Sequence, residues 1–149
     1  MANVYRTIKD RLIVKLQAVS ALQEIKTQKT FDFTGFPSCF IVPAEGSSDY
    51  ETNTEDTRIY AYECHIFYQY DQQKTAVADA LDNLYDVCDD VLDSFAEDKQ
   101  LLTPSAMSLP SGKTMIEVRP VFAGYEEIPE KELLKAIIKL SVIISVDNS

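Results

Sequence analysis

The apolar residues of this chain follow two periods, and each period predicts one kind of element. Within residues 3–22 and 73–98 they recur at steps of three and four, the spacing that places side chains on one side of a helix. Two helices are therefore expected. Their apolar positions are Val4, Ile8, Leu12, Leu16 and Val19 in the first, and Val77, Leu81, Leu84, Cys88, Val91 and Phe95 in the second.

Elsewhere apolar residues alternate with polar ones, as they do in strands that bury one face. Loose alternation over residues 24–33 and the short run SCFIVP predict two short strands. The run TRIYAYECHIFYQY predicts a long strand with one strongly aromatic face. Residues 114–125 and 133–147 predict the last two strands.

We therefore expect an α+β fold in which two main helices pack on one mixed or antiparallel sheet, in the order α-β-β-β-α-β-β. Pro120 has no backbone N–H to donate within a ladder, so it is expected at a sheet edge or a bulge. A chain of 149 residues normally forms one domain. A single domain over residues 1–149 is expected, with a long exposed loop at 44–56.

Composition and charge narrow the location and the partners. No apolar run reaches the roughly 20 residues of a membrane span, and the N-terminus lacks the apolar region of a secretory signal. We expect a soluble, cytoplasmic protein without a membrane partner. The formal net charge is −10, from 24 acidic and 14 basic residues, and the basic residues do not cluster. Phosphate neutralisation is therefore not expected to be a main source of affinity.

The second predicted helix carries a line of aspartates on the side opposite its apolar residues, again at steps of three and four. Like charges at this spacing cost a few tenths of a kcal/mol per pair, whereas each buried leucine or phenylalanine contributes roughly 1.5 to 3 kcal/mol. The helix is therefore expected to form. The aspartates are Asp79, Asp82, Asp86, Asp89 and Asp93.

Three interpretations of this line are open. The first is a solvated face. The second is a surface that repels polyanions or binds a basic partner. The third is a site for a hard cation. A cation site usually draws on loop carbonyls as well, and no EF-hand pattern is present. No metal or other cofactor is predicted.

The residues that could carry catalysis lack suitable partners. Cys39, Cys64 and Cys88 form an odd set without metal-ligand spacing, so reduced and mostly buried thiols are expected. Cys64 and His65 point to opposite faces of a strand and cannot form a nucleophile and base pair. The tyrosines of that strand are expected in the core and not as a stacking platform for nucleic acid. No catalytic motif is present, and no catalytic residue is predicted.

Several stretches, taken in order, resemble the neck proteins of tailed bacteriophages. They are VYRTIKDRLIVKLQAV, FPSCFIVPAEG and TRIYAYECHIFYQY, followed by a long helix and a C-terminal pair of strands. The nearest family is the tail terminator, also called the tail completion or head-tail joining protein. The resemblance covers nearly the whole chain. It rests on the order of elements and on the sequence patterns FPxCFIVP and RIYxYxxxIFYQY.

This resemblance implies a virion structural protein, assembled in the host cytoplasm, that forms a ring, terminates the tail tube and joins the tail to the head. Its partners would be copies of itself, as a hexamer, together with the tail tube protein and the head connector protein. DNA would pass through the lumen without specific binding. The aspartate line would then face the lumen and repel DNA phosphates, or contact a subunit or the connector.

The exposed loop 44–56 and the turn 125–132 are candidates for segments that become ordered when the tube or the connector arrives. Their candidate contact residues are Asp49, Tyr50, Glu51, Glu126 and Glu127.

Two other classes of protein stay open. An acidic chaperone that binds an export substrate for a secretion system is also small, α+β and commonly dimeric. The long strands and the lack of a broad apolar groove in the periodicities argue against it. A small enzyme with a split site is the third class, and the missing motifs argue against that one.

Overall fold

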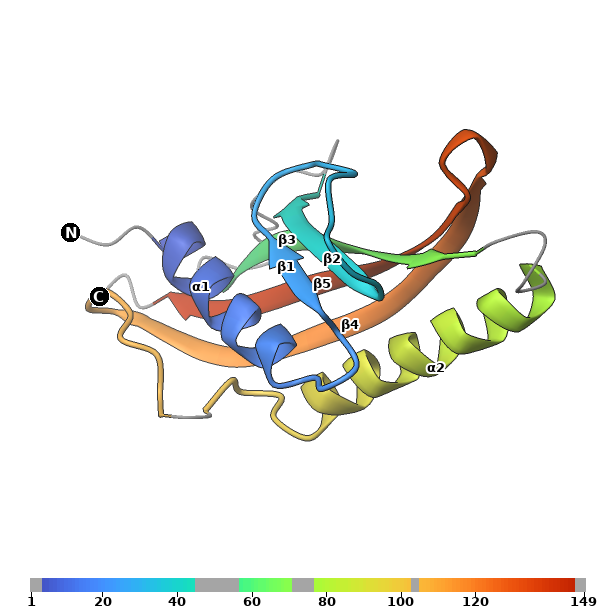
Figure 1. The fold of residues 1–149 in the computed structure, drawn as a ribbon. Coiled ribbons are helices and arrows are strands. Elements are labelled where there is room, and N and C mark those ends of the chain that lie inside the picture. Colours follow the sequence, from blue (N-terminus) through green and yellow to red (C-terminus); the bar gives the residue numbers. More distant parts are fainter. Residues whose placement is uncertain (1–3, 45–56, 71–76, 103–104, 147–149) are drawn as a thin grey trace.

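A computed structural model of the protein describes residues 4–44, 57–70, 77–102 and 105–146 (Figure 1). The helices are α1 (Val4–Gln17), α2 (Val77–Ala96) and the short 3₁₀ helix η1 (Pro129–Lys131). The strands are β1 (Glu24–Lys26), β2 (Ser38–Pro43), β3 (Thr57–Gln69), β4 (Lys113–Ile128) and β5 (Leu133–Val146). The α+β class is confirmed. The predicted order is matched apart from η1, which intervenes between the last two strands.

The strands form one sheet in the order β1-β2-β3-β5-β4. β1 and β2 run parallel and the other neighbours are antiparallel, so the sheet is mixed. β3 and β5 lie at its centre and pair from Thr57 opposite Ser145 to Gln69 opposite Leu133. Because side chains alternate along each strand, this long register fixes which residues of the two strands share a face.

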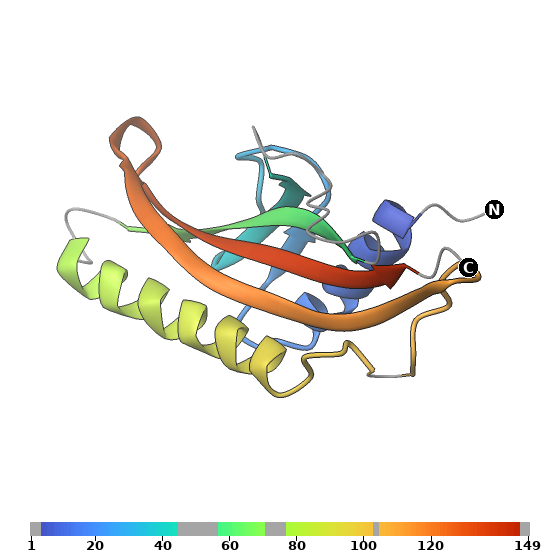
Figure 2. The same cartoon turned by 180° about the vertical axis from the view of Figure 1, so that it is seen from behind.

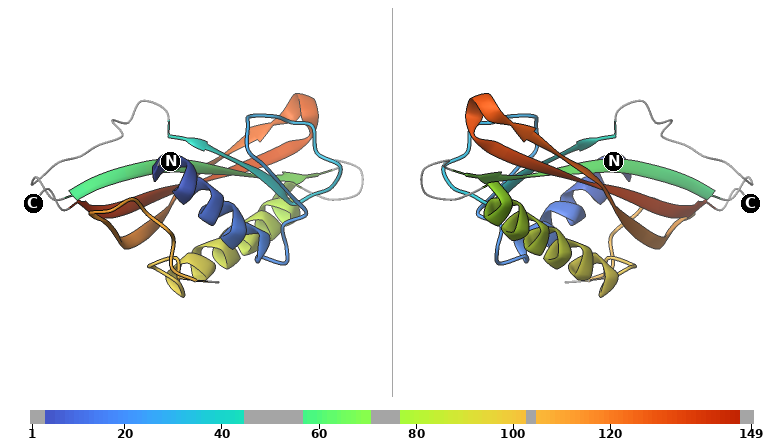
Figure 3. Two further views of the ribbon diagram at one scale, coloured as in Figure 1. Left: turned by 90° about the vertical axis from the view of Figure 1, so that its left-hand side faces the viewer. Right: turned by 90° about the vertical axis from the view of Figure 1, so that its right-hand side faces the viewer.

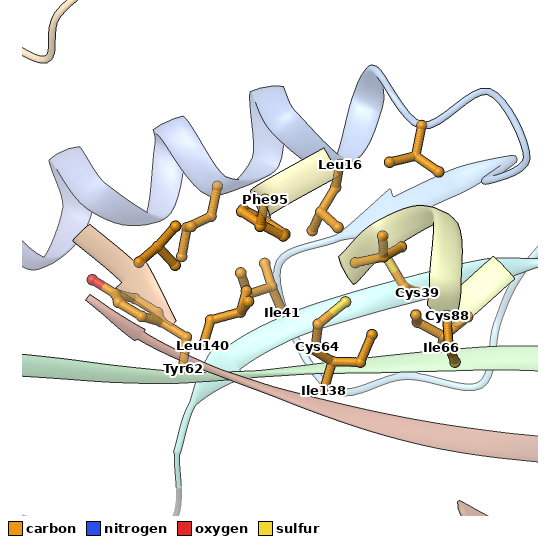
Figure 4. Packing of buried hydrophobic residues seen from close by; sticks show 14 of the residues in the cluster. Leu16, Cys39, Ile41, Tyr62, Cys64, Ile66, Cys88, Phe95, Ile138 and Leu140 are labelled. Atoms are coloured by element: carbon orange, nitrogen blue, oxygen red, sulfur yellow. The ribbon is translucent and has the colours of Figure 1, made fainter. Parts of the chain in front are cut away.

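Both helices lie on the same face of the sheet (Figure 3). In Figure 4, Leu16 of α1 and Phe95 of α2 lie on the same side of the sheet as Tyr62 and Cys64 of β3. β5 buries its whole predicted apolar face in this layer. Those residues are Leu134, Ala136, Ile138, Leu140, Val142, Ile144 and Val146.

Part of the opposite face is covered by residues 27–37, which fold back across one end of the sheet. The rings of Phe31 and Phe33 lie 5.5 and 5.4 Å from the ring of Phe67. This corrects the prediction of a strand over residues 24–33, because β1 spans only three residues and the phenylalanines that follow it cover the sheet instead. The apolar cluster beneath them contains Phe40, Val42, Phe67, Ile128 and Leu133.

The apolar side of α2 is turned slightly from the predicted line. Leu84, Cys88, Val91 and Phe95 are buried as predicted, whereas Leu81 is half-buried. The side chain of the other predicted seam residue, Val77, lies outside the described part of the chain. Two positions that the periodicity missed, Ala80 and Val87, are buried in the same layer.

The ends of several elements also differ from the predictions. α1 ends at Gln17 and not at residue 22, because the chain tightens into a turn in which the N–H of Val19 donates to the carbonyl of Leu16 at 3.0 Å. α2 ends at Ala96, two residues early. β4 continues past residue 125 to Ile128.

Two cations of α1 fix this helix to the segment after α2. The Nζ of Lys15 lies 3.3 Å from Oδ2 of Asp98, and each side chain is only 11% exposed. Arg11 donates from Nη1 to the carbonyl of Leu101 at 2.5 Å and to the carbonyl of Ser105. Breaking a buried ion pair leaves an uncompensated buried charge, so this contact holds α1 against the segment that follows α2.

The Lys15 and Asp98 pair leads to a prediction about stability. We expect Asp98→Ala to lower the free energy of unfolding by about 3 to 5 kcal/mol, because the ammonium of Lys15 stays buried without its carboxylate. The matched control is Asp86→Ala, an exposed aspartate on α2, which should change stability by no more than about 0.5 kcal/mol. Urea denaturation of the three proteins measures both effects. Equal losses in the two variants would contradict the prediction.

Candidate functional site

The acidic line lies on the outer side of α2. Asp79, Asp82, Asp86, Asp89 and Asp93 are all exposed, opposite the residues that α2 buries. α2 contains six aspartates and no lysine or arginine, so no base of its own helix neutralises it. The sixth aspartate, Asp90, was not part of the predicted line.

Asp90 extends the acidic surface toward the end of α1. Asp90, Asp93 and Glu97 line one side of a shallow groove, and Ala18, Val19 and Ser20 line the other. Sequence periodicity missed Asp90 because it lies off the line of threes and fours. Its exposure shows that the acidic surface is wider than one line.

An exposed aromatic cluster adjoins the acidic line. The ring of Tyr85 on α2 lies 5.6 Å from that of Phe122 and 6.2 Å from that of Tyr125, both on β4, with edge-on geometry. Tyr85 and Phe122 are each 36% exposed, and Tyr125 is 50% exposed. On α2, Asp82 and Asp89 lie three residues before and four after Tyr85, so their carboxylates flank its ring. We call these three rings the aromatic patch.

β4 forms an edge of the sheet, beside α2 (Figure 2), and Pro120 lies in it. The predicted edge position of Pro120 is therefore confirmed. The N–H of Val118 points away from β5 and donates to the carbonyl of Lys99 at 2.7 Å. Backbone donors two residues apart point the same way in a strand, so Pro120 removes the next outward donor.

The ladder of β4 also has register shifts between Met115 and Glu117 and between Phe122 and Gly124. Gly124 has a φ of 130°, a backbone conformation that suits glycine. Irregular ladders and proline at an edge hinder the addition of another strand. This edge therefore offers its side chains more readily than its backbone.

The predicted contact residues of the C-terminal turn need a correction. Glu126 and Glu127 lie in strand β4, and the turn itself is formed by η1 and by Glu132, whose φ is 51°. Glu126 forms an ion pair with Lys135 at 3.4 Å, and Glu127 accepts a hydrogen bond from the hydroxyl of Tyr70 at 2.9 Å. The remaining candidates, Asp49, Tyr50 and Glu51, lie outside the described residues.

The three cysteines are buried and none forms a disulfide. Burial raises the pKa of Cys88 to about 12, and a hydrogen bond with Cys39 together with burial raises the pKa of Cys64. Thiols in this state are weak nucleophiles. Cys64 faces the helices, whereas His65 stacks on Phe40 on the opposite face, with ring centres 4.6 Å apart.

His65 is held by the carboxylate next to it on the same face. Its Nε2 lies 2.9 Å from Oε1 of Glu63, and its Nδ1 is buried without a hydrogen-bond partner in the described part of the chain. Burial lowers the pKa of His65, and the charges of Lys135 and Lys29 act in the same direction, against the opposing hydrogen bond to Glu63. The imidazole is therefore neutral and structural near pH 7.

Within the described residues, no group of three or more histidine, cysteine, aspartate or glutamate side chains is placed to hold a metal ion. No helix among them is long and apolar enough to cross a membrane. The surface over α2 and β4 is the candidate site, because it combines exposed carboxylates with three exposed aromatic rings.

A scan against protein-family models finds no match for the chain, and a search of curated proteins finds none either. Among solved structures, the fold is similar to that of a chain from the virion of a native gene transfer agent particle. The TM-score is 0.56, the sequence identity is 9%, and the alignment covers 95% of this chain and 94% of that chain. The likeness extends over nearly the whole of both chains and is a likeness of fold.

The environment of His65 predicts one part of the pH dependence of stability. The pKa of His65 is lower in the folded protein than its ordinary value of 6.5, so the unfolded chain takes up the proton first as the pH falls. This contribution to stability is complete above pH 6.5 and is lost as the pH falls through the folded-state pKa. His65→Gln keeps an N–H donor for Glu63 but does not titrate.

We therefore expect the free energy of unfolding of the unmodified protein to exceed that of His65→Gln by more at pH 8 than at pH 5.5, because the contribution of His65 is lost at the lower pH. The carboxylates common to both proteins cancel in this comparison. Urea denaturation of the two proteins across this range measures the difference. A difference that does not change with pH would contradict the assignment.

Proposed function

We propose that this protein is a virion structural protein of a tailed-phage neck, where copies of it form a ring that terminates the tail tube and joins the tail to the head. The observation that carries the proposal is the end-to-end similarity of fold to a chain of a gene transfer agent virion. The resemblance of three sequence stretches to tail terminators supports the same role. A role without catalysis agrees with the buried thiols and the neutral, structural histidine.

The proposed partners are further copies of this chain, as a hexamer, together with the tail tube protein and the head connector protein. The aromatic patch on α2 and β4 favours contacts with these partners, because exposed tyrosines and phenylalanines are typical of protein interfaces. DNA passes through the ring without specific binding, since a surface with six aspartates and no base repels phosphates. Assembly takes place in the host cytoplasm and the product resides in the virion.

Two placements of the acidic line agree with a ring. Facing the lumen, the carboxylates would keep the duplex sliding and prevent it from binding to the wall. Facing a neighbouring subunit or the connector, they would pair with basic side chains. In either placement, the segment around Asp49, Tyr50 and Glu51 and the hairpin tip at η1 are proposed contacts with the tube or the connector.

Mass in solution and at the end of a tail tube tests the ring. We expect hexamers, either for the protein alone or after addition of polymerised tail tubes, because the fold is proposed to close a ring on the tube. Light scattering with electron microscopy of tube ends measures both. A strict dimer under every condition, without tube binding, would contradict the proposal and favour an acidic secretion chaperone.

Charge reversal on α2 tests the acidic line. Asp82→Lys combined with Asp86→Lys should leave the folded structure intact, because both residues are exposed, and should impair DNA passage or head-tail joining. Thermal unfolding checks the fold, and a joining assay with purified heads and tails checks the function. Normal joining by a folded double variant would show that the line has no role in the ring.

A further inference from the structure

The two helices carry opposite charge. α2 contains six aspartates and no base, a net charge of −6. α1 contains Arg6, Lys9, Arg11 and Lys15 against the single acid Asp10, a net charge of +3. Lys15 is buried in its pair with Asp98, and Arg11 donates to the carbonyl of Leu101. The remaining bases of α1, Arg6 and Lys9, outweigh the exposed Asp10 by one charge. In a chain of net charge −10, this local positive excess can attract the acidic surface of another copy.

The basic residues of α1 lie on different sides of the helix. Arg11 and Lys15 point to the segment after α2, as described above. Arg6, Lys9 and Ile13 follow at steps of three and four, so they share another side of the helix. Arg6 is exposed, and Lys9 and Ile13 are half-buried. Ile13 is thus the apolar part of this side, whereas Val14 lies on another side of α1, in a groove with Thr7, Asp10 and Met107.

The acidic surface likewise has an apolar centre. The aromatic patch of Tyr85, Phe122 and Tyr125 is flanked by the carboxylates of α2. Interfaces are commonly built from an apolar, often aromatic centre and a polar rim. The aromatic patch and α1 are chemically complementary, because apolar residues would face apolar residues and carboxylates would face bases.

The two surfaces lie at different ends of the subunit. In Figure 1, α1 lies toward one end of the sheet, and the first turns of α2 lie toward the other, near the hairpin that joins β4 to β5. Figure 3 shows both helices on the same face of the sheet. One copy can therefore offer α1 to a first neighbour and the aromatic patch to a second. Contacts of this heterologous kind generate closed rings when the rotation between copies closes.

Two alternatives to this contact are disfavoured by the structure. A symmetric contact between two aromatic patches would bring the acidic lines of two copies together, and juxtaposed like charges are costly. Addition of a strand to β4 is hindered by Pro120, by the bond from Val118 to Lys99 and by the two register shifts. A helix that packs on the side chains of the patch meets neither obstacle.

We propose that copies of this protein associate head to tail, with α1 of one copy packed on the aromatic patch of the next and with Arg6 and Lys9 facing Asp82, Asp86 and Asp89. The proposal rests on the ring proposed above and identifies the surfaces that join its subunits. It assigns the part of the acidic line nearest the aromatic patch to a subunit contact.

Complementary charge reversal tests this contact. The first variant carries Asp82→Lys and Asp86→Lys, and the second carries Arg6→Glu and Lys9→Glu. Each variant alone places like charges on both sides of the contact, so its self-association should weaken by about tenfold or more. In an equal mixture, the reversed α2 of one variant meets the reversed α1 of the other, and the unreversed surfaces also meet. The mixture should therefore assemble again, in alternation, to the size of the unmodified ring.

Analytical ultracentrifugation of each variant and of the mixture, with and without tail tubes, measures the outcome. Thermal unfolding confirms that each variant is folded. Arg119→Glu with Lys139→Glu is the matched control, because it reverses two exposed bases outside α1 and should leave assembly unchanged. Tyr85→Ser with Tyr125→Ser should weaken assembly without any change of charge.

The results separate this proposal from the ring itself. If the unmodified protein forms rings and the mixed variants fail to assemble, or if the single variants assemble normally, the head-to-tail contact is overturned and the ring stands. If the unmodified protein forms no ring in solution or on tubes, both proposals fail. If the α2 variant is unfolded, Asp82→Asn with Asp86→Asn replaces it, and if the α1 variant is unfolded, Arg6→Gln with Lys9→Gln replaces it. Weakened association of the neutral variant is then the expected result, and unchanged association overturns the contact.

Discussion

The burial of one side of α2 against the sheet is the interaction on which the rest of the molecule depends. Each buried leucine or phenylalanine, such as Leu84 and Phe95, contributes roughly 1.5 to 3 kcal/mol, whereas each pair of neighbouring aspartates costs only a few tenths. The packing term is therefore larger than the repulsion. As a result, α2 can hold six like charges in fixed positions on its outer side, which the isolated helix would not favour.

Much of this arrangement follows from the sequence, because it depends on period alone. The alternation of β5 and of the tyrosine strand β3 predicts which face of each is buried, and the structure confirms both. The steps of three and four in α2 likewise place its aspartates outside. The prediction fails where a tertiary contact replaces local pattern: residues after β1 alternate loosely, yet Phe31 and Phe33 pack across the sheet on Phe67 and do not extend the strand.

The aromatic patch shows why the candidate site could be predicted only in part. In a regular strand, Phe122 and Tyr125 would point to opposite faces, because they are three residues apart. The register shift between Phe122 and Gly124 brings Tyr125 opposite Ala136 while Phe122 lies opposite Ile138. Ala136 and Ile138 both face the helices, so both rings reach the side of Tyr85. The alternation of residues in the sequence does not predict this bulge. The aromatic patch is therefore seen only in the folded chain.

The proposed contact also bears on the two placements of the acidic line. Arg6 and Lys9 are only two charges, and Asp10 on the same helix opposes them, so α1 cannot neutralise six aspartates. Those nearest Tyr85 would be paired across the contact. Asp90 and Asp93 lie toward the other end of α2, beside the end of α1 in the same copy, and would keep their charge. In a closed ring every copy would contribute such unneutralised carboxylates, and a subunit contact and an electronegative passage would then both derive from one helix.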